Sequence, residues 1–362
     1  DSLFILKDDG VFRLTGSGGS WSITPLDTST RITAPDSAAV VNNQIFALCD
    51  QGIVTISDVG VQVISRPIED QLQELISADY TKLKTLSFGV SYETDRKYYL
   101  WTISAASDTS PTMAFVYNTF TQTWTWRVKN VSHAVVNKAD DKLYLCNPGD
   151  KHVLNERKSL TFRDFVDEEV DGISVVSYSG REIVLNTTVG VDLGYLMYSS
   201  SSVYSMVTAV DASTNTVTVA DLKVWPVGDI TVLKVIDCQF EYTVQHFDNP
   251  GVMKHFQEVQ LLFRSSSFIN GFMSFFTDLS GGYSNTRVNG NYGSSLWGLS
   301  PWGSGPWGGL TRPKPIRVFV PREKSRGTLL SIKFSVANAY AAWSLNGVSV
   351  QYDWVSERDS RS

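Results

Sequence analysis

The feature that most constrains the fold of this chain is a hairpin pattern that recurs along its first half. In each repeat, a short apolar run is followed by a turn rich in Asp, Asn or Gly and then by a second apolar run. The clearest repeats are residues 3–14 and 45–56, which turn at residues 7–10 and 49–52. Paired runs of this kind are typical of antiparallel β-hairpins.

The repeats have a regular spacing. A third unit begins at residues 98–101 and returns at 114–117, and a fourth begins at 143–146 and returns at 152–154. The starts lie about 40 to 50 residues apart, which is the period of propeller blades. Cys49 and Cys146 occupy the same place in their units and support this alignment. The pattern predicts propeller-like hairpin repeats over residues 1–170, with a β-sandwich built from hairpins as the alternative.

Helical signals are scarce in the sequence. One helix is predicted over residues 67–77, because Pro67 suits the first helical position and apolar residues then recur at helical spacing. Those apolar residues are Ile68, Leu72, Leu75 and Ile76. Nearly all other segments are short runs of Val, Ile, Thr, Tyr and Phe between turn residues, so we expect an all-β protein.

The second half of the chain predicts two further β regions. Residues 171–236 contain short strands close together, which favours a small inserted β-barrel. Residues 237–362 favour a β-sandwich, and residues 329–336 alternate between apolar and polar side chains as a half-buried strand does. A Gly/Trp-rich loop, at about residues 280–313, is expected to interrupt this sandwich.

The Gly/Trp-rich segment carries the strongest functional signal. Its tryptophans recur at a constant step, each directly before a glycine, and its Gly and Pro content disfavours a helix or an inner strand. Aromatic residues with few charges are typical of interface cores, so the segment is predicted to contact a partner protein. Packing on its own domain is the alternative. The candidate interface residues are Tyr283, Tyr292, Trp297, Trp302 and Trp307.

Composition points to an assembly. Charged residues make up 19% of the chain and aromatic residues 12%, which suggests surface that is buried against other subunits. The net charge of −6 argues against tight sequence-independent binding of nucleic acid. It is compatible with a channel wall that repels DNA rather than holding it. No apolar run reaches the roughly 18 residues of a membrane span.

A search for catalytic and metal-binding patterns yields no candidates, so we expect no catalytic residue, no metal site and no cofactor. The histidines have no ligand spacing, and no CxxC pair is present. The three cysteines are expected to be buried, apolar and reduced. Residues 16–20 are rich in glycine but precede a strand, so a linker between blades is favoured over a phosphate loop. The start at Asp1 suggests a processed product or a piece of a longer chain.

Several segments in combination resemble one known family. They are the opening hairpin at residues 3–14, the helix start at 66–70, the pairs at 117–118 and 123–124, and the segments at 254–258 and 320–323. In their order they are similar to the tail nozzle proteins of short-tailed bacteriophages, also called tail tubular protein B, and to related tail hub proteins.

The resemblance implies a structural virion protein that is not an enzyme. Its propeller-like body with added β domains would form a homo-oligomeric ring, with six copies as the expected number. The ring would lie in the phage tail, conduct and retain the genome, and dock to the adaptor or portal-side protein and to a tail fibre or spike. DNA would pass through the lumen without specific binding, and assembly would occur in the host cytoplasm, without stable membrane association.

Two other functions remain open from the sequence. A carbohydrate-binding propeller or sandwich module, used for tail-associated receptor binding, would use exposed tryptophans to stack on sugar rings. A glycoside hydrolase would need two carboxylates about 5 to 10 Å apart, and the sequence does not single out such a pair.

Overall fold

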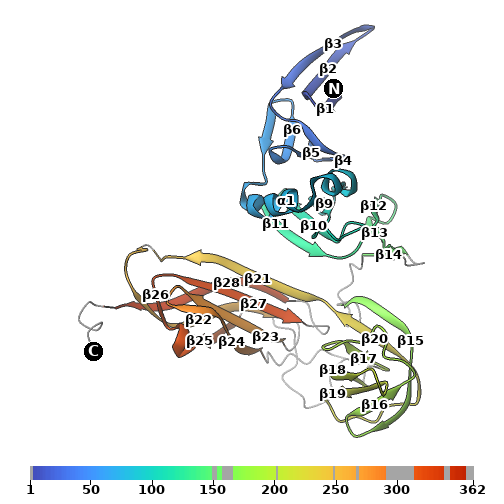
Figure 1. The fold of residues 1–362 in the computed structure, drawn as a ribbon, viewed down its shortest axis with the longest axis vertical. Coiled ribbons are helices and arrows are strands. Elements are labelled where there is room, and N and C mark those ends of the chain that lie inside the picture. The colour runs from blue at the N-terminus through green and yellow to red at the C-terminus, as the bar shows by residue number, and fades with distance from the viewer. Residues whose placement is uncertain are drawn as a thin grey trace. The chain divides into compact units, whose positions relative to one another are not determined.

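The computed structural model describes residues 3–148, 153–156, 166–200, 203–247, 249–265, 269–290, 314–337 and 343–355. The chain separates into two compact units, Asp1–Arg157 and Lys158–Ser362. Both consist largely of antiparallel strands (Figure 1), which confirms the all-β prediction. The division into residues 1–170, 171–236 and 237–362 remains a prediction.

The amino-terminal unit contains four antiparallel sheets, each formed by strands that follow one another in the chain. The first sheet comprises β1 (Leu3–Lys7), β2 (Gly10–Ser17) and β3 (Ser20–Asp27). The second comprises β4 (Ile32–Val41), β5 (Gln44–Cys49), β6 (Gly52–Ser57) and β7 (Gly60–Val63). The third comprises β8 (Phe88–Tyr92), β9 (Lys97–Thr102), β10 (Met113–Asn118) and β11 (Thr123–Val128). The fourth comprises β12 (His133–Asn137), β13 (Lys142–Cys146) and β14 (Val153–Asn155). The predicted hairpins are present as β1–β2, β5–β6, β9–β10 and β13–β14.

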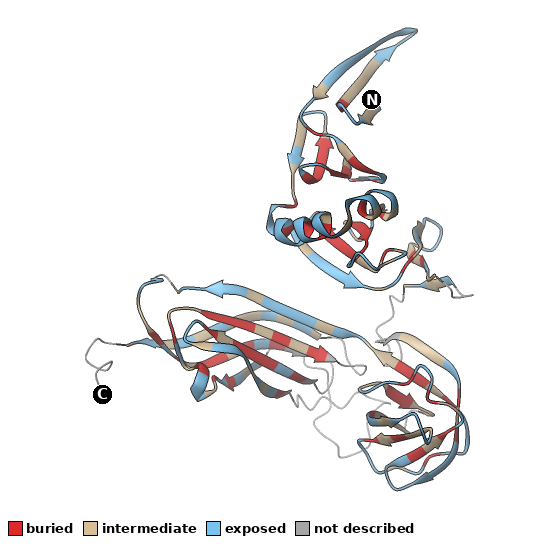
Figure 2. Cartoon of the chain, in the orientation of Figure 1, coloured by how far each residue is buried: buried red, intermediate tan, exposed pale blue. Residues whose placement is uncertain are grey.

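These sheets pack face to face in chain order, and a separate core lies between each successive pair (Figure 2). Strand β5 shows how one sheet serves two cores. Ala47 and Cys49 face the first sheet, whereas Phe46 and Leu48 face the third. Since side chains alternate along a strand, an unbroken apolar run such as that of β5 is what a sheet covered on both faces requires.

The helix is longer than the sequence predicts. A short 3-10 turn, η1 (Arg66–Ile68), leads into α1 (Glu69–Leu86), which is interrupted by non-helical backbone at Asp79. The Asp79 side chain accepts a hydrogen bond from the Lys82 backbone N–H and so caps a second helical segment. That segment contributes Leu83 to the core between the second and third sheets. The prediction of residues 67–77 captured only the first segment.

One local prediction in this unit is wrong, and the prediction that the cysteines are buried holds for Cys49 but not for Cys146. Residues 16–20 do not link two blades; they form the turn between β2 and β3 within the first sheet, with Gly18 and Gly19 at positive φ. The cysteines also differ from one another. Cys49 is buried, Cys238 is intermediate and Cys146 is exposed. Cys49 lies on the face of its sheet that packs against the preceding sheet, whereas Cys146 lies on the face away from the preceding sheet. The repeat alignment that paired these two residues is therefore shifted by one residue.

The carboxy-terminal unit begins with a closed six-stranded barrel, which confirms the predicted small barrel. Its core includes Trp225, which is buried among aliphatic side chains. The strands follow the order β15-β16-β19-β18-β17-β20 around the barrel. Their bounds are β15 (Val166–Ser179), β16 (Glu182–Leu185), β17 (Leu196–Tyr198), β18 (Tyr204–Asp211), β19 (Thr216–Val219) and β20 (Gly228–Val235).

Two further sheets share one core in this unit. One has the order β21-β27-β23-β24; in the other, β22 pairs with β25, β26 and β28. The apolar residues of the predicted alternating strand, Leu330, Ile332, Phe334 and Val336, are all buried. The strands are β21 (Asp237–Gln245), β22 (Lys254–Ser265), β23 (Ile269–Thr277), β24 (Ser280–Gly290), β25 (Lys314–Phe319), β26 (Arg326–Gly327), β27 (Leu330–Ala337) and β28 (Trp343–Trp354), with a 3-10 turn, η3 (Arg322–Lys324), before β26.

The expected loop at about residues 280–313 is wrong in its first part. Residues 280–290 form strand β24, which pairs with β23 at the edge of its sheet. An edge strand tolerates a glycine-rich sequence because only one side of its backbone must be paired. Buried Val288 attaches this strand to the core. Residues 291–313 lie outside the described residues.

Candidate functional site

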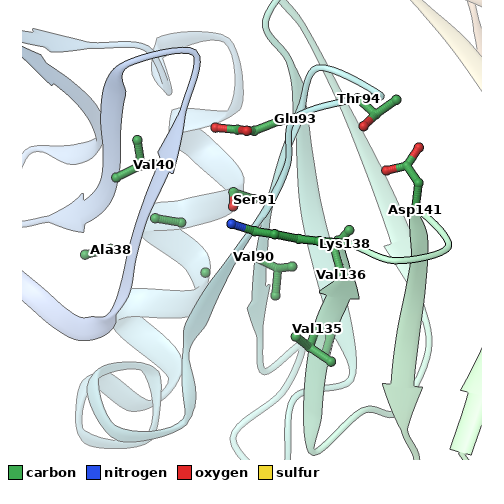
Figure 3. A pocket seen from close by; sticks show the side chains of 13 residues that line it. Ala38, Val40, Val90, Ser91, Glu93, Thr94, Val135, Val136, Lys138 and Asp141 are labelled. Atoms are coloured by element: carbon green, nitrogen blue, oxygen red, sulfur yellow. The ribbon is translucent and has the colours of Figure 1, made fainter.

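The amino-terminal unit contains a groove of 670 Å³ between three strands of different sheets (Figure 3). The strands are β4, β8 and β12, and each is the terminal strand of its sheet. One edge of each of these strands therefore has no β-ladder partner among the described strands. The three strands line the groove together. The lining residues used below are Val40, Gly89, Ser91, Glu93, Val135 and Lys138.

The path of β4 beside the groove depends on an irregularity that the sequence does not signal. The pairing of β4 with β5 shifts between Ala34 and Ala39. Ser37 fills the gap: its Oγ accepts a hydrogen bond from the Leu48 N–H at 2.8 Å and donates one to the Ala34 carbonyl at 2.5 Å. The bulge is therefore stabilised by a side chain rather than by the β-ladder.

Strands β4 and β8 approach each other closely at Ser37. The buried Tyr98 hydroxyl donates a hydrogen bond to the Ser37 carbonyl at 2.7 Å. Burial raises the pKa of Tyr98 above its usual value of 10.0, so the hydroxyl stays protonated as a donor. A Cβ at Gly89 would lie 2.0 Å from the same carbonyl oxygen, so glycine is required at this position. These contacts hold the wall of the groove in place.

The groove has polar groups at one end and aliphatic groups along its wall. In Figure 3, Glu93, Thr94 and Asp141 lie at one end, and the Lys138 side chain extends across toward Ser91. The lining residues include no histidine and no cysteine. The groove therefore combines charged and hydroxyl groups with an aliphatic wall, an arrangement that suits binding of a ligand.

One predicted interface residue lies in the described part of the chain. Tyr283 is on β24, 48% exposed, and its hydroxyl donates a hydrogen bond to Glu241 Oε1 at 3.0 Å. Its ring lies 5.6 Å from that of Phe276, and both line a shallow hollow of 630 Å³ with Tyr242. The other predicted residues, Tyr292, Trp297, Trp302 and Trp307, lie outside the described residues.

Sequence reasoning missed two buried lysines in the carboxy-terminal unit. The Lys324 Nζ donates to the carbonyls of Ser280, Gly281 and Gly282 at 3.0, 3.0 and 2.7 Å, and the side chain is 3% exposed. Lys254, which is fully buried, contacts the carbonyls of three other residues, Asn249, Val252 and Thr328, in the same way. No sequence signal separates these lysines from surface lysines, because their acceptors are backbone atoms.

The basic stretch around Arg317 also has an internal role. Arg317 on β25 contacts Glu258 on β22 through two nitrogens, with the closest distance 2.6 Å. Hydrogen bonds from Arg317 and Gln260 lower the pKa of Glu258 below its usual value of 4.5. Arg317 and Lys324 therefore both bind groups of their own unit.

Comparison with known proteins gives no family. No family model matches the chain, and no curated protein matches its sequence. Among the residues that the structure describes, no three His, Cys, Asp or Glu side chains are grouped as metal ligands. Within the same residues, no helix is long and apolar enough to cross a membrane.

Proposed function

We propose that this chain is a structural subunit of a ring-shaped assembly of the phage tail nozzle type. The observation that carries the proposal is the stack of four meander sheets in the amino-terminal unit, packed in chain order. Successive meanders with terminal strands gathered around one groove are the arrangement of propeller blades. This arrangement agrees with the propeller-like body that the sequence resemblance implies.

The carboxy-terminal unit is consistent with the same proposal. The closed barrel is the kind of added β domain that the resemblance implies, and the two sheets with a shared core are interpreted as the predicted sandwich. In this reading the sandwich presents the Gly/Trp-rich segment to an adaptor, portal-side protein, fibre or spike. The subunit would act without catalysis, in a virion, around DNA that its acidic charge does not attract.

Electron microscopy of the purified chain tests this proposal. We expect symmetric rings, with six copies as the expected number, and no change in assembly on addition of DNA. A particle that stays a monomer at the concentrations used for imaging would refute the ring. Deletion of residues 294–309 is expected to leave a folded chain that no longer docks to its partner, and normal virion assembly of that deletion would refute the role of the Gly/Trp-rich segment.

Carbohydrate binding is the second candidate, and the hollow beside Tyr283 favours it. Three aromatic residues, Tyr242, Phe276 and Tyr283, line it together with the carboxylate of Glu241 and the hydroxyls of Thr243 and Ser331. Sugar sites combine ring stacking with polar groups of this kind. Titration with a glycan panel, followed by calorimetry, tests it. Binding that is lost in Tyr283→Ala but kept in the control Tyr80→Ala would favour this function; no binding by the wild type would exclude it for that panel.

A further inference from the structure

One face of the first sheet carries mainly apolar side chains, with Lys7 at one end, where its Nζ lies 5.6 Å from the centroid of the Phe12 ring. Strand pairing sets Leu3 opposite Leu14 and Leu14 opposite Ile23, and it sets Ile5 opposite Phe12 and Phe12 opposite Pro25. Directly paired residues point to the same side of a sheet, so these rows lie on one face. We call the set the outer apolar face; its members are Leu3, Ile5, Phe12, Leu14, Trp21, Ile23 and Pro25.

Within the described residues of the amino-terminal unit, no other sheet packs on this face. Leu3, Trp21 and Ile23 are 60%, 64% and 62% exposed. Part of the opposite face is packed, since Val11 joins the core with the second sheet, together with Phe4, Leu6 and Leu26. A contiguous apolar patch with a single charged residue at its end is unusual on a soluble monomer and marks an interaction surface.

The order of the sheets indicates what would cover it. The second and third sheets each give one face to the preceding sheet and the other to the following sheet. At one end of the stack, the outer apolar face has no preceding sheet among the described residues. At the other end, the fourth sheet has no following sheet among the described residues of this unit. The stack therefore has a direction. The first sheet presents a face that a preceding sheet would cover, and the fourth sheet presents a face that a following sheet would cover.

The free face of the fourth sheet has an apolar centre and a polar margin. Val135 and Val153 are each 61% exposed, and Tyr144 and Cys146 lie between them on the central strand β13. The pairing also places Lys142, opposite Asn137, and His133, opposite Cys146, on this face, at its two ends. An apolar centre with a polar rim is the usual anatomy of a protein interface.

We propose that the outer apolar face of one copy packs against the free face of the fourth sheet of a second copy. The contact continues the sheet-on-sheet packing already present within the chain, and it joins copies head to tail. A head-to-tail contact repeats from copy to copy and closes into a ring when the rotation allows. The inference rests on the proposed function, because it names the surfaces through which the ring would form.

Crosslinking through Cys146 tests the direction of the contact. In a Cys238→Ala background, Leu14→Cys puts a thiol at the centre of the outer apolar face, and a short bis-maleimide then joins thiols of neighbouring copies. We expect a ladder of covalent multimers that disappears when Cys146→Ser is added. Dimers that persist in Cys146→Ser would show two outer apolar faces packed together, and an absence of crosslinks would show that a second copy does not cover this face; both results overturn the proposal.

A charge substitution provides a second measurement without crosslinking. Ile23→Glu places a carboxylate on the outer apolar face, whereas Ser22→Glu places one on the other face of the same exposed strand. Mass photometry should show at least a roughly tenfold rise in the concentration for half-assembly with Ile23→Glu, equivalent to about 1.4 kcal/mol. Ser22→Glu should match the wild type. Equal assembly of both variants would overturn the proposal.

The two proposals fail in different ways. Rings that form normally in Ile23→Glu would refute the contact described here and leave the ring function standing. A wild-type chain that stays monomeric in both mass photometry and electron microscopy would refute both. In that case the outer apolar face is covered by something other than a second copy.

Discussion

The buried ammonium of Lys324 is expected to stabilise the carboxy-terminal unit more than any sequence-based reading of this residue suggests. Its Nζ uses all three of its donors on the backbone carbonyls of residues 280–282, at the turn that begins β24. It thereby ties η3 to this turn. Lys324→Met keeps most of the side-chain volume and removes the charge, so it isolates the three hydrogen bonds.

The size of the stability loss depends on the surroundings of the three carbonyl acceptors. A hydrogen bond from a charged donor contributes roughly 1.5 to 3 kcal/mol, so three of them set an upper limit near 9 kcal/mol. Two effects reduce this figure. Gly281 and Gly282 are exposed, so water can replace the lost donor, and methionine removes the desolvation penalty of a buried ammonium. We therefore expect Lys324→Met to lower the free energy of unfolding by about 2 to 4 kcal/mol.

Scanning calorimetry measures this effect, because the two compact units can give separate transitions. For a unit of this size the expected loss lowers the midpoint temperature of the carboxy-terminal transition by roughly 5 to 15 °C. Arg322→Met is the matched control: it lies two residues away in the same turn, is exposed, and should change stability by less than about 0.5 kcal/mol. If Lys324→Met behaves like Arg322→Met, the three contacts contribute nothing measurable and the reasoning is wrong.

Three further predictions concern other parts of the chain. Gly89→Ala should destabilise the amino-terminal unit by about 2 kcal/mol or more in urea unfolding, because its Cβ would lie 2.0 Å from the Ser37 carbonyl oxygen; Ser91→Ala on the same strand is the control, and equal stability would contradict the close approach. The lowered pKa of Glu258 contributes stability that is present above its usual value of 4.5 and is lost as pH falls toward the folded value. Glu258→Gln should remove that part of the pH dependence of the midpoint temperature, and an unchanged profile would count against it. Iodoacetamide should modify exposed Cys146 long before Cys49, whose thiol pKa burial raises to about 12; mass spectrometry of the peptides would show the opposite order if this assignment were wrong.

Much of the local structure could be predicted from the sequence. The hairpins at residues 3–14 and 45–56 could be predicted because turns that contain Asp and Gly separate their apolar runs. Turn formation depends on a few neighbouring residues. The short strands of the barrel could be predicted for the same reason, because turn residues separate them. The sequence did not reveal the second segment of α1, which Asp79 caps beyond the end of the predicted helix, nor strand β24, whose glycines suggested a loop.

The candidate sites were less predictable. The groove depends on the Ser37 bulge and on contacts from Gly89 and Tyr98, which are distant in the chain. The buried lysines depend on backbone carbonyls, which every residue has and which no side-chain pattern marks. Of the predicted interface residues, only Tyr283 lies in the described part, where it contacts Glu241 and Phe276.

The sequence by itself determined the all-β class, the recurring hairpins and the barrel, because propensity, alternation and turn residues act over a few neighbours. The tertiary structure alone decided which side of each strand is covered. Leu14 and Val11 are both apolar residues of β2, yet one lies on the outer apolar face and the other in a core. Burial depends on what packs against a face, and that partner is set by the order and stacking of sheets far apart in the chain.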